Sequence, residues 1–291
     1  MHFLSKQKVW VFDGAMGTMI QKLYQDEYIC PEELNLTYPE IIFKIHQEYI
    51  KAGSDIIQTN TFGANYLRLK RFGLEQKTYE INSRAVEIAR KISDGKRIVA
   101  ASVGPLGELI EPYGEVTQEE AFQSFYEQAK ALSEVDFINI ETVQSLDEAE
   151  IIIKAIRSRL SLPISVTVTF HKTPRGYFTI MGESIEDFVN RVSSWDVQMI
   201  GTNCGEGFNQ SLEIICEIKE LTNLPLIAKP NAGLPQFKDG KTIYPETPEV
   251  IETLVEKFFN NCIKILGGCC GTTPDHIKVI KKIANKINYN G

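Results

Sequence analysis

Two apolar, β-branched runs separated by a segment of helical periodicity occupy residues 136–170, which read DFINIETVQSLDEAEIIIKAIRSRLSLPISVTVTF. We predict a strand over residues 136–141, a helix over 146–160 and a second strand over 164–170. Strands that are apolar along their whole length are typical of parallel sheets covered by helices on their faces. This segment therefore predicts a strand-helix-strand unit with parallel strands.

The same alternation extends through the whole chain. Strands are expected at 9–13, 54–59, 97–103, 136–141, 164–170, 197–203, 225–229 and 262–266. Helices are expected after them at 39–52, 78–92, 117–133, 146–160, 184–195, 210–221, 248–259 and 274–287. Thr117 with Glu120, and Ser184 with Asp187, are capping pairs at two helix starts. Eight such units predict an α/β fold, a single (β/α)8 TIM barrel domain over residues 1–291. A doubly wound open sheet is the alternative, and 25–38 and 231–247 are the longest stretches expected to be irregular.

Composition narrows the class of protein. The 291 residues are 43% hydrophobic, which is enough for a large core. A net charge of −7 and a pI near 5.3 argue against nucleic acid or an anionic membrane as partner. No signal peptide or membrane span is expected, and six cysteines without regular spacing favour a reducing compartment. We therefore expect a cytoplasmic protein.

Polar residues gather at the predicted carboxyl ends of the strands, which is where TIM barrels carry their sites. They are Asp13 with the segment Gly14, Ala15, Met16 and Gly17, then Glu141, Asn203, Cys204, Asn231, Cys269 and Cys270. The two acidic side chains could hold an ammonium group. Backbone N–H groups of residues 14–17, at a helix start, could receive a carboxylate.

Three of these residues suggest a metal. Glycines flank the adjacent pair Cys269 and Cys270, so a tight turn could direct both sulfurs to one point, and Cys204 is the candidate third ligand. Three thiolates leave one zinc position open, as in catalytic sites. Two other interpretations stay open at this point: the cysteines could be buried small hydrophobes, or Cys269 and Cys270 could form a vicinal disulfide. For Cys216 and Cys262 we expect a role in packing alone.

Six motifs resemble the homocysteine S-methyltransferase family. They are Asp13-Gly-Ala-Met-Gly-Thr18, Thr59-Asn-Thr-Phe-Gly-Ala-Asn65, Gly104-Pro-Leu-Gly107, Thr202-Asn-Cys204, Pro230-Asn-Ala-Gly233 and Gly267-Gly-Cys-Cys-Gly-Thr-Thr-Pro274. The likeness spans nearly the whole chain and is strongest to the homocysteine-binding module of cobalamin-dependent methionine synthase.

The resemblance implies a (β/α)8 barrel in which zinc, held by Cys204, Cys269 and Cys270, activates the thiol of homocysteine. It implies that Asp13 and Glu141 hold the substrate amino group and that Asn231 can approach the metal when substrate is absent. Asn203 is expected near the substrate. The expected enzyme makes methionine by methyl transfer to homocysteine.

The methyl donor has two candidates. The motifs Pro230-Asn-Ala-Gly233 and Cys270-Gly-Thr-Thr-Pro274 resemble those of the cobalamin-linked branch of the family. This resemblance favours methylcobalamin on a partner corrinoid protein as the donor. S-methylmethionine or S-adenosylmethionine is the alternative. Another small thiol as acceptor, a thiol-binding subunit inactive without its partner, and a zinc-storage barrel also remain open.

Overall fold

Eight parallel strands form the centre of the molecule. The structure is a computed structural model that describes residues 8–24, 30–238, 240–260 and 263–290. The strands are β1 (Trp10–Val11), β2 (Ile56–Gln58), β3 (Ile98–Val103), β4 (Phe137–Val143), β5 (Ile164–Val168), β8 (Met199–Cys204), β9 (Leu226–Pro230) and β12 (Ile265–Leu266). Their order is β1-β12-β9-β8-β5-β4-β3-β2, and an isolated parallel bridge from Phe12 to Ile56 joins the two outer strands. The sheet therefore closes, which confirms the (β/α)8 barrel over the doubly wound alternative.

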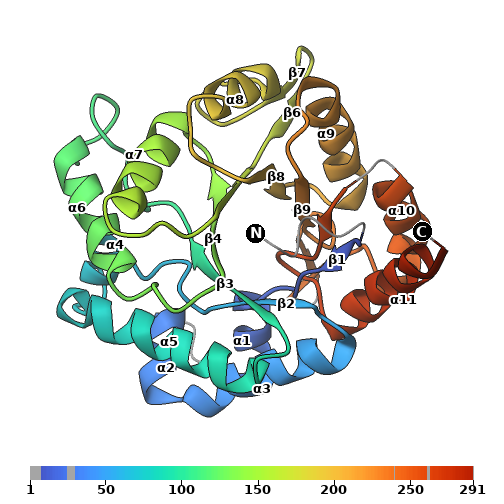
Figure 1. The fold of residues 1–291 in the computed structure, drawn as a ribbon, viewed down its shortest axis with the longest axis horizontal. Helices are drawn as coiled ribbons and strands as arrows, with labels where there is room; N and C mark the ends of the chain where they lie inside the picture. The colour runs from blue at the N-terminus through green and yellow to red at the C-terminus, as the bar shows by residue number, and fades with distance from the viewer. Residues whose placement is uncertain (1–7, 25–29, 239, 261–262, 291) are drawn as a thin grey trace.

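Helices surround the barrel (Figure 1). The eight predicted ones are α3 (Pro39–Ala52), α5 (Thr78–Ser93), α6 (Gln118–Ala129), α7 (Leu146–Arg157), α8 (Ile185–Val192), α9 (Phe208–Leu221), α10 (Pro248–Asn260) and α11 (Pro274–Asn290). Both capping boxes are confirmed, because the Thr117 and Ser184 side chains accept from the N–H groups of Glu120 and Asp187 and each acidic side chain bonds back. In the described part of the chain, no helix has the length and apolar character needed to cross a bilayer.

Shorter elements fill the connections. They are α1 (Gly17–Leu23), the 3-10 helix η2 (Pro31–Glu33), α2 (Leu34–Thr37), α4 (Tyr66–Lys70), the 3-10 helix η3 (Glu75–Lys77) and the hairpins β6 (His171–Thr173) with β7 (Gly176–Phe178) and β10 (Gln236–Lys238) with β11 (Lys241–Ile243). The expectation of irregular structure was therefore wrong for residues 31–37, 236–238 and 241–243, whereas residues 231–235 and 244–247 are irregular as expected. Three-residue strands and single helical turns are too short to show a periodic pattern.

The barrel interior has two zones, because alternate residues of each strand point inward. The apolar zone is one cluster, made of Phe12, Ile56, Ala100, Phe137, Met199, Ile227 and Ile265. Two residues further along four of these strands, toward their carboxyl ends, stand Gln58, Ser102, Asn139 and Lys229. The polar zone therefore lies between the apolar zone and the carboxyl ends of the strands.

Candidate functional site

The three predicted cysteines lie together at the carboxyl ends of their strands. Cys204 is the last residue of β8, and Cys269 and Cys270 follow β12. The sulfurs of the three residues all lie within 4.8 Å of one another, and those of Cys204 and Cys269 are 3.0 Å apart. All three are free thiols, so the structure contains no vicinal disulfide between Cys269 and Cys270. The predicted convergence is confirmed.

Backbone geometry holds this cluster in place. Cys204 has a φ of 58° and Gly271 a φ of 80°, both in the left-handed region. A Cβ at Gly271 would stand 2.1 Å from the ring of Tyr244, so only glycine fits there. The N–H of Cys269 donates to the Pro230 carbonyl at 2.8 Å, which ties the turn after β12 to the end of β9.

The cluster has the chemistry of a soft-cation site. The close approach of the Cys204 and Cys269 thiols to Cys270 lowers the pKa of Cys270 to about 3. The same contacts, with Cys269 as the largest cause, hold the pKa of Cys204 well above its usual range. Three sulfurs at this separation cannot all be ionised unless a cation compensates them. Three thiolates are a donor set that Zn²⁺ takes, so the residues present fit the metal implied by the resemblance.

Asn231 lies beside the cluster. Its N–H donates to the Cys204 carbonyl at 3.4 Å, and its Nδ2 donates to the Gly205 carbonyl at 2.7 Å. Its Oδ1 is buried and has no hydrogen-bond partner among the described residues. A buried carbonyl oxygen without a donor costs free energy unless another group satisfies it.

Asp13 is a buried carboxyl group with one oxygen in use. Only 2% of the residue is exposed. Its Oδ2 accepts from the Gln58 N–H at 2.8 Å, whereas its Oδ1 has no partner in the described part of the chain. Burial raises the pKa of Asp13 to about 7, against a partly opposing attraction from Lys229. An approaching cation would therefore favour the ionised form and bind the unused oxygen.

Glu141 is held from several sides. Its Oε1 accepts from Gln58 Nε2 and Ser102 Oγ, both at 2.5 Å. Its Oε2 accepts from Lys229 Nζ at 2.9 Å and from Asn139 Nδ2 at 3.2 Å. The carboxylate therefore sits on top of the polar zone of the barrel in a fixed orientation.

Lys229 is a site residue that the sequence analysis missed. Its Nζ is bonded to Glu141 Oε2, donates to Gln58 Oε1 at 2.9 Å and lies 4.5 Å from the centre of the Phe12 ring. The side chains of Lys229 and Glu141 are only 3% and 5% exposed. The available signal was a lysine inside an otherwise apolar strand, because such a charge needs a buried partner. Lys229 bonds directly to Glu141 and acts on Asp13 only through a longer-range attraction, so burial still raises the pKa of Asp13.

The segment 14–17 leads into α1. A Cβ at Gly14 would stand 2.8 Å from both Thr272 Oγ1 and the ring of Tyr49, so the backbone packs closely there. The Ala15 N–H donates to Thr272 Oγ1 at 3.2 Å and is thus engaged within the protein. Met16 is the N-cap of α1 and Gly17 its first residue, without a side-chain cap. Binding of a carboxylate by this segment stays a prediction.

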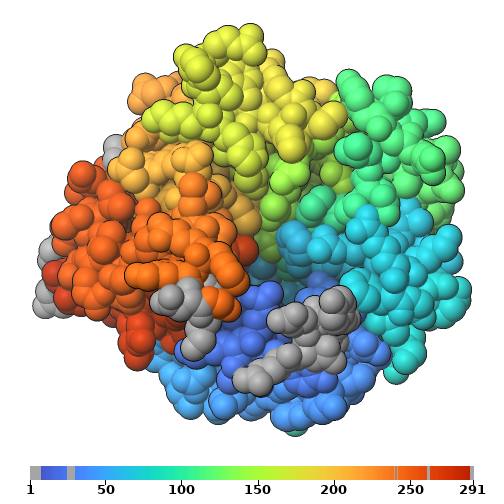
Figure 2. All heavy atoms as spheres, turned by 180° about the vertical axis from the view of Figure 1, so that it is seen from behind, coloured from blue at the N-terminus to red at the C-terminus, as the bar shows by residue number. Residues whose placement is uncertain are grey.

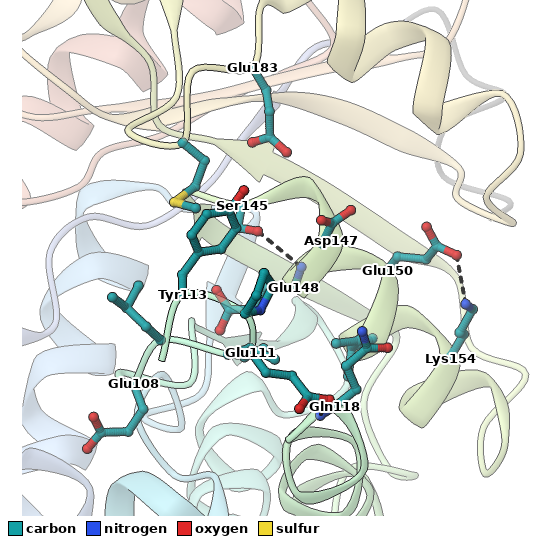
Figure 3. Close-up of a pocket in the computed structure, with 15 residues that line it drawn as sticks. Glu108, Glu111, Tyr113, Gln118, Ser145, Asp147, Glu148, Glu150, Lys154 and Glu183 are labelled. Atoms are coloured by element: carbon teal, nitrogen blue, oxygen red, sulfur yellow. Dashed lines mark hydrogen bonds and ion pairs between the residues drawn. The ribbon is translucent and has the colours of Figure 1, made fainter. Parts of the chain in front are cut away.

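The mouth of the barrel is hollowed. Figure 2 shows this hollow at the centre of one face, where segments from both halves of the sequence, including the orange loop after β9, surround it. A separate pocket of about 430 Å³ lies beside the start of α7 (Figure 3). Its lining carries the carboxyl groups of Glu108, Glu111, Asp147, Glu148, Glu150 and Glu183, and none of the three cysteines. We therefore place the candidate site at the cysteine cluster.

Residues 10–284 match the homocysteine S-methyltransferase family. The chain belongs to this family. It is 31% identical over 302 residues to a methionine synthase of Mycobacterium leprae, and 31% identical over 300 residues to a methionine synthase of Mycobacterium tuberculosis. These matches cover 97% and 96% of this chain and 25% of each relative, so the chain spans about a quarter of their length.

Solved structures agree on the fold. The metallated form of the homocysteine methyltransferase MmuM from Escherichia coli superimposes with a TM-score of 0.81 at 22% identity, covering 97% of this chain and 98% of that one. Its apo form gives a TM-score of 0.75. At 22% identity this similarity shows that the two proteins share the barrel fold and carries no statement about function.

Proposed function

We propose that this chain is a zinc-dependent homocysteine S-methyltransferase that produces methionine, with residues 1–291 forming its homocysteine-binding domain. The observation that carries the proposal is the group of three sulfurs within 4.8 Å of one another at the mouth of the barrel. Membership of the family, and relatives that are described as methionine synthases, support homocysteine as the acceptor. Cys204, Cys269 and Cys270 are the proposed ligands.

Zinc held by Cys204, Cys269 and Cys270 would supply a Lewis acid that lowers the pKa of the substrate thiol. The homocysteine sulfur then forms a bond to the methyl carbon with its own electron pair. The bond from that carbon to the donor breaks, its electrons stay with the donor, and the thiol proton goes to solvent. No side chain of the protein is required as a general base in this step.

The buried acidic residues recognise the other end of the substrate. Asp13 offers an unpartnered oxygen to the ammonium group, and Glu141 stands on the same polar zone in a fixed orientation. The segment Gly14 to Gly17 is proposed to receive the carboxylate. Asn231, with its unsatisfied Oδ1, is proposed to face the metal when substrate is absent. Together these groups favour an α-amino acid with a thiol side chain.

The donor we propose is methylcobalamin on a partner corrinoid protein. The hollow mouth supports it, because a large macrocycle must bring its methyl group within direct reach of the sulfur. S-methylmethionine or S-adenosylmethionine is the runner-up. Purified protein with zinc and homocysteine should demethylate free methylcobalamin slowly. Fast turnover of S-methylmethionine with no reaction at methylcobalamin would overturn the choice of donor and leave the acceptor assignment in place.

Metal analysis tests the ligand assignment. Each of Cys204→Ala, Cys269→Ala and Cys270→Ala should lose zinc and activity together. Cys216→Ala is the matched control, because Cys216 lies in the middle of α9 and should retain both. Cys262 lies outside the described residues. X-ray absorption should show a fourth sulfur when homocysteine binds; full zinc occupancy in Cys269→Ala would disprove the site.

A further inference from the structure

Asn203 directs hydrogen atoms toward the cysteine cluster. Its Oδ1 accepts from the Thr142 N–H at 2.7 Å and from Thr167 Oγ1 at 2.8 Å. A backbone N–H can only donate, so the oxygen of the amide must face Thr142 and its NH₂ group must face the other way. That NH₂ group donates to Thr142 Oγ1 at 2.8 Å and lies 3.9 Å from the sulfur of Cys269. The donor character of the group beside Cys269 is therefore fixed by the backbone.

Thr142 brings a second donor to the cluster. Its Oγ1 accepts from Asn203 Nδ2 and lies 3.9 Å from the sulfur of Cys204. A hydroxyl has one hydrogen and two lone pairs, and the bond from Asn203 uses a lone pair and leaves the hydrogen free. The remaining hydrogen is thus available to Cys204.

The backbone at Thr142 is unusual in a way that serves this contact. Thr142 has a φ of 61°, a left-handed conformation that β-branched residues rarely adopt. It lies where the pairing of β4 with β5 shifts register between Ile140 and Val143. Bulges of this kind re-aim side chains and are common beside active sites. The two bonds from Thr142 to the Asn203 side chain hold the residue in this conformation.

We propose that Thr142 and Asn203 act as positioning residues that donate hydrogen bonds to the sulfurs of Cys204 and Cys269 and so strengthen metal binding. The inference rests on the proposed zinc site. Three thiolates around one dication leave an excess negative charge, and donors aimed at the sulfurs disperse part of it. They also fix the side-chain directions of two ligands before the metal arrives, which is how outer hydrogen bonds support metal sites.

The test is the zinc affinity of Thr142→Val, measured by competition with a chromophoric chelator. Valine keeps the β-branched shape and removes the hydroxyl, so we expect zinc to bind roughly 10 to 100-fold more weakly. Thr142→Ser should restore an affinity close to that of the unaltered protein. The matched control is Thr202→Val, which also removes a buried hydroxyl. That hydroxyl donates to the Val168 carbonyl at 2.8 Å and has no hydrogen bond to a sulfur of the cluster.

The outcomes separate this inference from the proposed function. Failure of the unaltered protein to bind zinc would remove the metal site itself. Zinc binding by Thr142→Val within about twofold of the unaltered protein, or an equal loss in Thr202→Val, would overturn the positioning role alone. The absorption of Co²⁺-loaded protein is the second readout: the sulfur-to-metal bands should shift in Thr142→Val and not in Thr202→Val. If Thr142→Val does not fold, Thr142→Ala is compared with Thr142→Ser by the same two measurements.

Discussion

Replacing Lys229 by Met should destabilise the barrel strongly. The substitution keeps much of the volume of the side chain but leaves the buried carboxylate of Glu141 without its counter-charge. Glu141 and Lys229 are 5% and 3% exposed, so water screens neither of them. Removing one partner of such a pair costs about 3 to 5 kcal/mol.

The remaining contacts set where in this range the cost falls. Glu141 keeps hydrogen bonds from Gln58, Ser102 and Asn139 after the substitution. These donors stabilise the lone carboxylate, so the expected loss is about 3 kcal/mol, at the lower end of the range. Loss of the ammonium above the Phe12 ring adds to it.

Urea denaturation of the zinc-loaded protein measures the effect. The control is Lys282→Met, the same substitution in an exposed pair with Glu252, which should leave the unfolding free energy nearly unchanged. The double variant Lys229→Met with Glu141→Gln should recover part of the loss, because no buried charge remains. Equal midpoints for Lys229→Met and Lys282→Met would refute the reasoning.

Two further predictions concern Asp13 and the packing of β8 against β9. Because burial raises the pKa of Asp13 from 3.8 to about 7, its contribution to stability is fully present below about pH 4 and is lost as the pH rises through about 7. Between pH 4 and 8 the free energy of unfolding should fall by up to ~4 kcal/mol less in Asp13→Asn than in the unaltered protein. Equal pH dependence of the unfolding free energy in the two proteins would contradict this. Gly201→Ala would place a Cβ 1.7 Å from the Ile227 carbonyl oxygen. A thermal melt should therefore show a loss of ~3 kcal/mol or more in the free energy of unfolding. The control is Gly17→Ala, whose Cβ would meet nothing within 4 Å and whose melting temperature should equal that of the unaltered protein.

The sequence predicted the elements whose pattern is long enough to be read. α7 and β5 appear within a few residues of the predicted bounds, because their apolar periodicity extends over a whole element and Ser145 caps the helix. The hairpin of β6 and β7 has three residues in each strand, and three residues do not define an alternation. Its pairing depends on the chain turning back on itself, which local composition does not determine.

The site shows the same division. Cys204, Cys269 and Cys270 could be brought together from the sequence because barrel geometry places all strand ends at one mouth. The partner of Lys229 could not be predicted, because the partner of an inward side chain depends on the successive registers of β4 with β5, β5 with β8 and β8 with β9. Thr142 gave no signal at all: a threonine favours extended backbone, and its left-handed φ arises from a bulge that only the paired strands define.

The closure of the barrel is uneven, and this has a consequence for ligand binding. β1 and β2 are joined by one isolated bridge, from Phe12 to Ile56, and by the Asp55 N–H on the Val11 carbonyl at 2.8 Å. The side chains of Asp55 and Asp13 add two bonds, from the Val11 N–H at 3.1 Å and from the Gln58 N–H at 2.8 Å. Such a thin junction is expected to open before the rest of the sheet, so the amide hydrogens of Asp55 and Gln58, which bond across it, should exchange with solvent sooner than those in the middle of β4. Asp13 stands directly at this junction. An amino acid bound to Asp13 and to groups on the other strands would link the strands on both sides of this junction. It would thereby slow amide hydrogen exchange at the junction without moving any strand.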